Sequence, residues 1–417
     1  MADEGHPLAP LLNPDGTLSF PAAYTVGDYY YGKNGVDNAQ RLLKNRIAAK
    51  AEFFNKSLTL RSDFTFQNTD IGSKQKRVQV PYSRYEGVIG YTGTNTNDLQ
   101  ERRQTTDYIA TNVYADYVKS IAEAHNFHFL LGYNYEQSTY KNITAQRNGI
   151  VYADANDINL TFGQSITTTG GYEKWAIAGG FFRVNYDFKR RYLLEINGRY
   201  DGSSKFPSDQ QWGFFPSASV GWRLSDESFW KVNPKVLSNV KIRASLGSLG
   251  NGNVDPYSFT ENFKITQSGR IFNGVRPQKT SQPNVVPTGL TWETSTTGNI
   301  GLDFSSLDNR LQFTGDFYRR WTKNMFTAGP TVPAIYGTDV PKGNYADLKT
   351  TGWEISLKWG DDFMVADKPF NYDLRFTLAD YRAVITKYNN PDKNLTDYYV
   401  GQHIGEIWGY QVEGLFH

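Results

Sequence analysis

The chain has 417 residues, a formal net charge of +2 and no cysteine. The lack of cysteine excludes disulfides, thiolate zinc sites and cysteine nucleophiles. The near-neutral charge, without a long basic block, predicts no nucleic-acid partner. Aromatic residues make up 15% of the sequence and glycine occupies 38 positions, a composition that suits strands, turns and interfacial aromatic belts.

Residues 1–43 are rich in Pro, Gly, Asn and Tyr, and we expect them to form a loop that is part of an extracellular segment. Beyond them, apolar and polar residues alternate with a period of two. This period indicates β-strands, because successive side chains leave a strand on opposite faces. The pattern predicts strands near 44–53, 58–67, 105–118, 126–139, 172–186 and 191–202, with long polar segments near 68–104 and 140–171.

The clearest alternation occupies residues 190–249, where three runs are close to the roughly 9–11 residues that a tilted strand needs to cross a bilayer. One parity is apolar and the other is polar, charged or glycine. We expect the apolar parity to face lipid and the polar parity to face the interior of a barrel. The apolar set is Leu194, Ile196, Val220, Ile242 and, later in the chain, Phe376; the polar set includes Glu195, Ser219 and Arg243.

The second half of the chain continues the pattern. A long loop is predicted at 250–291 and another at 325–348. The strands predicted here lie near 212–224, 240–249, 292–304, 310–324, 349–360 and 370–384. Together with the first half, the pattern predicts about twelve strands in antiparallel order.

The connections between these strands alternate in length. Short turns near 54–57, 119–125, 187–190, 305–309 and 361–369 alternate with the long loops near 68–104, 140–171, 250–291 and 325–348. Two connections depart from this order: 203–211 is short, and 225–239 is long enough for a helical turn with Ser225 as N-cap. Short turns on one side and long loops on the other are typical of outer-membrane barrels. The predicted fold is all-β, an antiparallel transmembrane β-barrel that is partial and has its long loops on one side.

Several separated motifs occur in one order. They are RYDGSSKF at 199–206, WGFFPSASVGWRLSDESFW at 212–230, KIRASLGSLGN at 241–251, NIGLDFS at 299–305, KTTGWEISLKWG at 349–360 and VGQHIGEIWGYQVEGLF at 400–416. With these motifs the chain resembles the SusC/RagA family of TonB-linked outer-membrane transporters, most strongly from about Gly171 onward.

The resemblance implies a larger barrel than the predicted strands supply, since plugged transporters of this kind have roughly 22 strands. Residues 44–417 would then be a partial TonB-dependent receptor β-barrel. A signal peptide, a small β-sandwich domain, a plug and the closing strands would lie outside the chain. The N-terminal residues MADEGHPLAPLLNPDG lack a basic region followed by an apolar core, so we expect a fragment of an exported protein.

The resemblance also implies a function. The protein would import oligosaccharides or peptides across the bacterial outer membrane, with a SusD-like surface lipoprotein as a lid and energy from TonB–ExbB–ExbD acting through the plug. It would not be an enzyme. Two alternatives stay open on the residues alone: a passive outer-membrane pore with about twelve strands, and a soluble or surface-exposed all-β binding protein.

No catalytic, cofactor-binding or metal-binding constellation is evident. The five histidines, His6, His125, His128, His403 and His417, do not have metal-ligand spacing. Gly247, Gly250 and Gly252 are out of order for a phosphate loop, so we interpret them as the end of a strand. Asp154, Asn156 and Asp157 lack the glycine and terminal glutamate of a calcium loop.

Charged residues of the inward parity are the remaining candidates. They could line a transport path or touch a plug; alternatively they pair with one another across strands in a wet lumen. This set consists of Glu195, Arg199, Asp201, Arg223, Arg243, Asp316 and Arg375. The loop aromatics Tyr29, Tyr30, Tyr31, Tyr257 and Phe272 could stack on a substrate or simply pack within loops. Pro216 lies inside a strand pattern and cannot donate to the ladder, so we expect a bulge or irregular pairing there.

Overall fold

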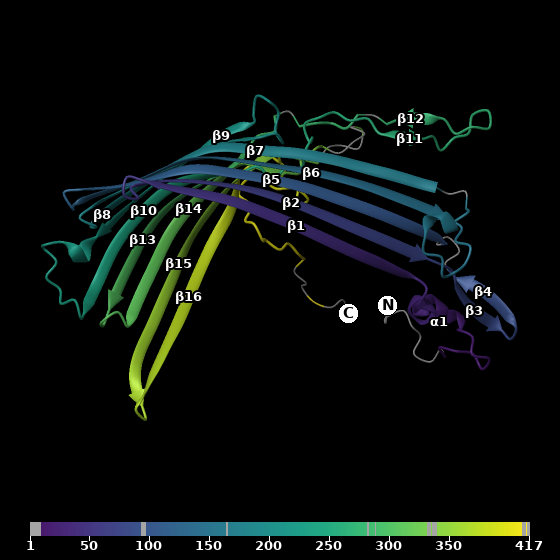
Figure 1. The fold of residues 1–417 in the computed structure, drawn as a ribbon, viewed down its shortest axis with the longest axis horizontal. Helices are drawn as coiled ribbons and strands as arrows, with labels where there is room; N and C mark the ends of the chain where they lie inside the picture. The colour runs from purple at the N-terminus through teal and green to yellow at the C-terminus, as the bar shows by residue number, and fades with distance from the viewer. Residues whose placement is uncertain are drawn as a thin grey trace. The chain divides into compact units, whose positions relative to one another are not determined.

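The structure is a computed structural model that describes residues 10–92, 97–163, 166–281, 283–287, 289–331, 335, 340–410 and 414. The described chain is predominantly β, as predicted, and twelve strands form one sheet (Figure 1). Their order in the sheet follows the chain: β1-β2-β5-β6-β7-β8-β9-β10-β13-β14-β15-β16. Strands that are neighbours in sequence are therefore neighbours in space, and alternate connections lie at opposite ends of the sheet.

The strands of this sheet have the following bounds. In the first half they are β1 Gly35–Phe53, β2 Leu58–Arg77, β5 Asp98–Ile121, β6 His125–Asn148, β7 Ile166–Phe188 and β8 Tyr192–Ser203. In the second half they are β9 Trp212–Arg223, β10 Leu237–Asn251, β13 Glu293–Ser306, β14 Leu311–Thr327, β15 Gly343–Val365 and β16 Lys368–Lys387. Two small hairpins lie in connections: β3 Val80–Tyr85 with β4 Val88–Thr92, and β11 Ile265–Gln267 with β12 Gln278–Thr280.

The helices are short. They are α1 Phe20–Thr25, α2 Gly27–Tyr31 and the 3₁₀ turns η2 Ile158–Leu160 and η3 Leu224–Asp226. In the part of the chain that the structure describes, no helix is long and apolar enough to cross a membrane. The helical turn predicted near SDESFW is present as η3, but Ser225 lies inside it. Arg223 occupies the N-cap without a side-chain capping bond, so the proposed cap is wrong.

The chain divides into two compact units. One consists of Met1–Ile47, Phe64–Ala110 and Glu136–Lys174, and we call it the smaller unit; the other consists of Ala48–Asp63, Thr111–Tyr135 and Trp175–His417, and we call it the larger unit. The smaller unit has its own apolar core, formed by Val78, Leu99, Ile150 and Ala155. Beside that core, the carboxylate of Asp98 accepts two hydrogen bonds from Arg77, at 2.9 and 2.5 Å.

Two segments that were predicted as long loops are strand in part. β2 and β5 continue through much of 68–104, and β6 and β7 continue into 140–171. The apolar parity is lost in these segments because polar side chains pair across the ladder instead. Asn68 donates to Asp107 at 2.7 Å, and Arg103 donates to Asp70 at 2.9 and 3.0 Å. Backbone pairing therefore extends further along the chain than the apolar alternation from which the strands were predicted.

The loop predicted for residues 1–43 contains regular structure in its described part. Ser19 caps α1 by accepting a hydrogen bond from the backbone N–H of Ala22, and Pro21 occupies the first turn, where its missing N–H costs nothing. Gly32 ends α2 in the left-handed conformation with φ of 65°, and β1 begins at Gly35. The predicted boundary near 44 placed the start of the first strand too late; the division into an extracellular segment and a barrel stays a prediction.

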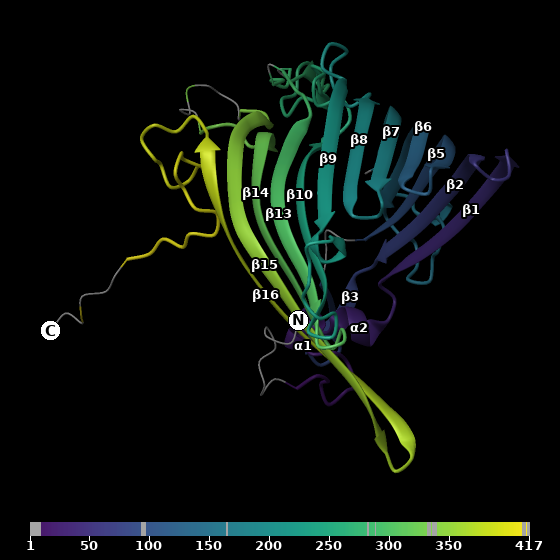
Figure 2. The same ribbon diagram turned by 90° about the vertical axis from the view of Figure 1, so that its left-hand side faces the viewer.

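The turns at one end of the sheet are tight. Lys189 and Arg190 connect β7 to β8 with φ of 49° and 58°, and Ala366 and Asp367 connect β15 to β16 with φ of 48° and 61°. Two successive positive φ values match the twist of antiparallel strands. The β15–β16 hairpin extends past β14, whose pairing with β15 stops at Leu311 opposite Trp359 (Figure 2).

Candidate functional site

The two faces of the sheet in the larger unit follow from the strand register. Glu195 is opposite Ser219, and Ser219 is opposite Ser245, so these residues share what we call the polar face. Arg243 is two residues from Ser245 on the same strand and lies on that face as well. Residues of the other parity form what we call the apolar face. Ile196, Val220, Ile242 and Phe376 are exposed there as predicted, whereas Leu194 is half-buried, opposite Tyr186 in the register.

The strongest polar cluster crosses three strands. The guanidinium of Arg243 in β10 donates to Asp303 in β13 at 3.0 and 3.2 Å. The same guanidinium donates to Asp316 in β14 at 2.7 and 2.6 Å. Asn299 adds a further hydrogen bond to Asp316 at 2.7 Å. One cation thus holds two carboxylates, and the cluster keeps one net negative charge on the polar face.

A glycine makes this cluster possible. Gly301 lies between Arg243 and Asp316 in the register, and a Cβ built on it would approach the Cζ of Arg243 to 2.5 Å. A side chain at this position would displace the guanidinium, so the glycine leaves the space through which Arg243 reaches the second strand beyond its own. The sequence showed the charges but not this gap, because the three positions are far apart along the chain.

Other charged residues of the polar face also have partners. Arg199 donates to both carboxylate oxygens of Asp201, at 3.0 and 2.8 Å, and lies over the ring of Phe181. Arg223 pairs with Asp226 at 3.3 Å. Neither of these two contacts crosses from one strand to another, so of these charged residues the Arg243 cluster is the one that matches the predicted cross-strand pairing. Arg375 is exposed and opposite Lys358 in the register, on the same face.

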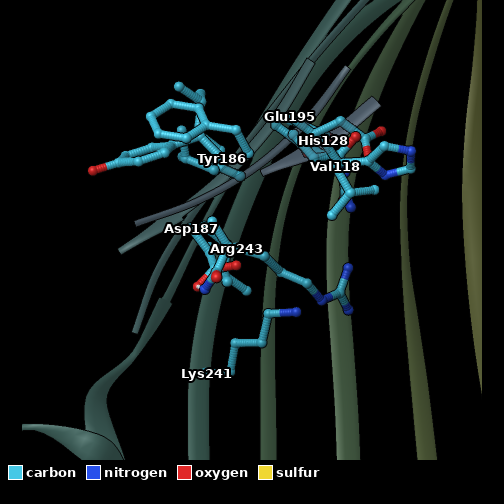
Figure 3. Close-up of a pocket in the computed structure, with 18 residues that line it drawn as sticks. Val118, His128, Tyr186, Asp187, Glu195, Lys241 and Arg243 are labelled. Atoms are coloured by element: carbon cyan, nitrogen blue, oxygen red, sulfur yellow. Dashed lines mark hydrogen bonds between the residues drawn. The ribbon is translucent and has the colours of Figure 1, made fainter. Parts of the chain in front are cut away.

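A pocket of about 470 Å³ opens beside Glu195. Its polar lining includes Asn126, His128, Glu195, Lys241, Arg243 and Asn299. Glu195 accepts hydrogen bonds from Asn185 at 2.7 Å and from Asn197 at 2.8 Å. Figure 3 shows Glu195 and His128 next to each other in the view, with the ring of Tyr186 away from them. The arrangement offers hydrogen-bonding groups of both signs to a hydrated solute.

The histidines take separate positions. His128 contacts Asp116 at 2.9 Å through Nε2, and Nδ1 of His125 lies 2.9 Å from the Tyr186 hydroxyl. His403 donates its backbone N–H to Glu406, while His6 and His417 lie outside the described residues. Within the described residues, no group of three or more His, Asp or Glu side chains is placed to hold a metal ion.

The acidic residues considered for calcium are engaged by other groups. Asp154 forms an ion pair with Lys33 at 2.5 Å, and the hydrogen bond from that ammonium lowers the pKa of the Asp154 carboxyl. Asp157 accepts from the backbone N–H of Asn159 at 2.8 Å and caps η2. Asp157 therefore organises the turn in which it lies, and Asp154 connects its loop to Lys33.

Pro216 does not produce a bulge. Its pairing with β8 is in register, opposite Gly198, so of the two predicted outcomes the bulge is wrong, and irregular pairing occurs on the β10 side. On the other side, the ladder between β9 and β10 ends at Ser217 opposite Gly247, next to the proline. The ring of Phe215 then lies against Gly250, where the two strands no longer pair. The β9–β10 ladder thus ends next to the proline, which has no backbone N–H to donate. Beyond that point the two strands stay in contact through the ring of Phe215.

This ring belongs to an apolar cluster that was not predicted from the sequence. The cluster, which we call the loop clamp, consists of Phe206, Phe215, Val254, Leu290 and Trp292. Val254 and Leu290 stand near the two ends of the long β10–β13 loop, and both are buried. The indole N–H of Trp292 donates to the backbone carbonyl of Gln211 at 2.8 Å. Gly250 and Gly252 provide space for the rings of Phe215 and Trp292, which explains the glycines better than a phosphate loop does.

Beyond the clamp, the β10–β13 loop is exposed. Tyr257 and Phe272, two of the aromatics singled out in the sequence, are exposed, and so are several apolar neighbours around β11 and β12. These neighbours are Phe263, Ile265, Ile271 and Val275. Tyr29 and Tyr30 are exposed, whereas Tyr31 packs against the core of the smaller unit. The sequence offered a single clue to the clamp. Its three aromatic residues, Phe206, Phe215 and Trp292, lie close to glycines at strand ends.

Comparison with known proteins places the chain among outer-membrane receptors. The family described as "TonB dependent receptor-like, beta-barrel" matches residues 6–408. TonB-dependent receptor P3 of Formosa agariphila is 25% identical over 429 residues, which cover 97% of this chain and 41% of the relative. TonB-dependent receptor SusC of Bacteroides thetaiotaomicron is 29% identical over 333 residues, which cover 78% of this chain and 31% of the relative.

Solved structures agree with the fold. The RagAB peptide transporter matches with a TM-score of 0.73 at 22% identity, covering 87% of this chain and 38% of that chain. The chain spans about two fifths or less of the length of these relatives. The soluble alternative is therefore wrong: the twelve strands are a stretch of antiparallel barrel sheet in the outer membrane. This chain belongs to the TonB dependent receptor-like β-barrel family, with the SusC/RagA character that its motifs predict.

Proposed function

We propose that this chain is the barrel segment of an active importer that takes up oligosaccharides or peptides together with a SusD-like surface lipoprotein. The observation that carries the proposal is the family match over residues 6–408, joined by similarity to a receptor named SusC over 78% of the chain. TonB–ExbB–ExbD would supply the energy through a plug, as the sequence resemblance implies. Both substrate classes are too large for diffusion through a narrow pore.

The polar face supports a hydrated path. Some of its charged groups are paired, as in the cluster of Arg243 with Asp303 and Asp316, and others, such as Arg375, are exposed. Glu195 and the pocket beside it add donors and acceptors of the kind that sugar hydroxyls and peptide groups use.

The β10–β13 loop supports capture at the outer surface. Its ends are fixed by the loop clamp, while its middle exposes aromatic and aliphatic side chains such as Phe263 and Phe272. Long ordered loops on a rigid scaffold commonly carry binding function. Exposed apolar side chains on a fixed base suit a surface that is covered by a protein lid.

Photocrosslinking in intact cells tests the lid. Photoreactive residues at Tyr257 and Phe272 should give adducts with a surface lipoprotein, whereas Lys189 in the β7–β8 turn serves as the control and should give none. A third loop site, Tyr336, lies outside the described residues but belongs to the same experiment. Adducts from Lys189 alone would invert the topology. No adduct from any loop site would leave the loops as a shield over the barrel mouth.

Uptake measurements test the energy coupling. Cells that express the intact protein should accumulate a fluorescent oligosaccharide or peptide, and loss of the proton gradient or of TonB should abolish that accumulation. Uptake that continues without TonB would instead support the passive-pore alternative. Measuring both substrate classes in the same cells shows which of the two is transported.

A further inference from the structure

The connection between β9 and β10 is unlike the other turns at its end of the sheet. Residues 224–236, which we call the basal segment, begin with η3 and run to the start of β10. The neighbouring connections at this end, such as Lys189–Arg190 and Leu307–Asn309, are tight turns with positive φ. A longer connection at the short-turn end is on the periplasmic side of an outer-membrane barrel. Its structure therefore needs an explanation of its own.

The first part of the basal segment is fastened to β8 and β9. The indole N–H of Trp222 donates to the Glu227 carboxylate at 2.9 Å, and Arg191 reaches the same carboxylate at 3.5 Å. The hydroxyl of Tyr192 is also hydrogen-bonded to Glu227. Within the segment, the backbone N–H of Trp230 donates to the carbonyl of Glu227 at 3.0 Å. One carboxylate thus gathers three side chains at the base of two strands.

The last part is fastened to the β13–β14 turn. The backbone N–H of Asp308 donates to the carbonyl of Lys235 at 3.0 Å, and that of Leu307 donates to the carbonyl of Val236 at 3.3 Å. The hydroxyl of Ser306 donates to the same carbonyl of Val236. The basal segment is therefore held at both ends and has a fixed surface rather than a mobile one.

That fixed surface is apolar and basic. Phe229 is 59% exposed, and Val232 and Val236 are exposed beside it. Lys231 and Lys235 alternate with these residues and are exposed, and neither forms an ion pair with another residue in the described ranges. Apolar side chains interleaved with unpaired lysines are typical of segments that lie in a membrane interface.

The apolar part continues the lipid-facing surface. The ring of Phe229 meets Trp222 edge to face, with centroids 6.4 Å apart, and Trp222 stacks on Tyr192 at 6.3 Å. Both Trp222 and Tyr192 belong to the apolar face, near the ends of β9 and β8. The row of rings thus passes from the strands into the basal segment without interruption.

We propose that the basal segment is an interfacial anchor that binds anionic phospholipid headgroups of the periplasmic leaflet. Phe229, Val232 and Val236 enter the boundary between headgroups and acyl chains, and the ammonium groups of Lys231 and Lys235 bind lipid phosphates. The occupant is lipid because the surface is continuous with the lipid-facing row of rings and its charge is complementary to phosphate. The anchor fixes the depth of β8–β10 in the membrane.

Site-directed labelling tests the position of the segment. This chain has no cysteine, so Val232→Cys gives a single site for a nitroxide label once any cysteine outside the chain is replaced by serine in the intact protein. In phospholipid nanodiscs the label should be more accessible to oxygen than to a water-soluble nickel complex. Asp367→Cys, at the tip of the β15–β16 hairpin, is the matched control and should show the opposite preference. A Val232 label that is fully accessible to the nickel complex would overturn the proposal. So would a label shielded from both reagents, because it would indicate a protein partner on the segment.

Lipid binding tests the lysines. The intact protein is prepared in nanodiscs of phosphatidylethanolamine with or without phosphatidylglycerol, and bound phosphatidylglycerol is measured by native mass spectrometry. The double variant Lys231→Gln with Lys235→Gln should lose roughly thirty-fold in affinity, since each lysine near a charged surface contributes about a fivefold preference. The matched variant Lys264→Gln with Lys279→Gln, in the β10–β13 loop, should keep the affinity of the parent. Equal retention by all three proteins would overturn the assignment of the phosphate site.

Discussion

Two stretches of the same sheet obey different rules. In β8, β9 and β10 of the larger unit, apolar and polar residues alternate along ladders in continuous register. In the parts of β2 and β5 that belong to the smaller unit, charged pairs such as Arg103–Asp70 replace the apolar parity. Both stretches are strands, so backbone pairing alone does not require an apolar face. The alternation of apolar and polar residues depends on whether lipid or water surrounds the strand. The backbone ladder depends on the fold.

The largest effect should come from placing a charge on the apolar face. We expect Ile196→Arg to destabilise the protein by about 2–4 kcal/mol, because the guanidinium must enter the hydrocarbon. Asn197→Arg, one residue on and on the polar face, is the control and should be tolerated. Ile143→Arg, on an exposed site among charged side chains in the smaller unit, should cost under about 1 kcal/mol. Unfolding in lipid vesicles by denaturant measures all three, and equal costs for Ile196→Arg and Asn197→Arg would show the assignment of faces to be wrong.

The next effect concerns ion pairs in the two stretches. We expect Arg243→Met to cost about 2–3 kcal/mol, because it leaves two half-buried carboxylates without their cation. Arg103→Met should cost less than about 1 kcal/mol, because Arg103 is 71% exposed whereas Arg243 is 28% exposed.

A compensated variant sharpens the comparison of ion pairs. Adding Asp303→Asn and Asp316→Asn to Arg243→Met should recover much of the lost free energy, since no buried charge remains unpaired. The same denaturant titration measures it. No recovery would indicate that the arginine stabilises the sheet by packing over Gly301 rather than by its charge.

A smaller effect of opposite sign is expected at a turn. Lys189 and Arg190 both adopt positive φ, which asparagine and glycine tolerate better than long side chains do. The double variant Lys189→Asn with Arg190→Gly should stabilise the β7–β8 hairpin by about 0.5–1 kcal/mol. Asp187, which accepts from the backbone N–H of Arg190 at 2.9 Å, is left unchanged. A melting temperature below that of the parent would mean that the two cations contribute more than the strain costs.

The smallest effect should appear at acidic pH. Hydrogen bonds from Tyr192 and Trp222 lower the pKa of Glu227 below its ordinary value of 4.5. A carboxyl whose pKa is lower in the folded state stabilises the fold above the unfolded-state pKa, and this contribution is lost as the pH falls through the folded-state pKa. The melting temperature of the parent should therefore drop below pH 4.5 by more than that of Glu227→Gln. Parallel pH profiles of the two proteins would contradict a stabilising role for the ionised carboxylate.

Individual residues show which features of the fold could be predicted from the sequence. Ile196, Val220 and Arg243 could be placed on their faces because period two is a local property of the chain. The extra length of β2 and β5 could not be foreseen, because it depends on cross-strand pairs such as Asn68–Asp107 that lie far apart in sequence. Long-range register, rather than composition, decides such contacts.

The candidate site was foreseen in its residue types and missed in its geometry. The charged parity pointed to Arg243 and Asp316, yet the gap at Gly301 that lets them meet had no local signature. Phe215 was noticed only as part of a family motif, and its burial depends on Pro216 ending one ladder. Glycine and proline thus affect a neighbouring strand. Gly301 leaves space for a side chain of that strand, and Pro216 provides no backbone donor to it.

The loop clamp has a consequence for how such receptors diversify. Val254 and Leu290 are buried at the two ends of the β10–β13 loop, so the sequence between them can change in length and character without disturbing the ladders. The clamp holds the two ends of the loop, and the residues between them can be exchanged. Recombination could therefore exchange the loop between related receptors through short stretches of coding sequence. The strands of the barrel would stay unchanged.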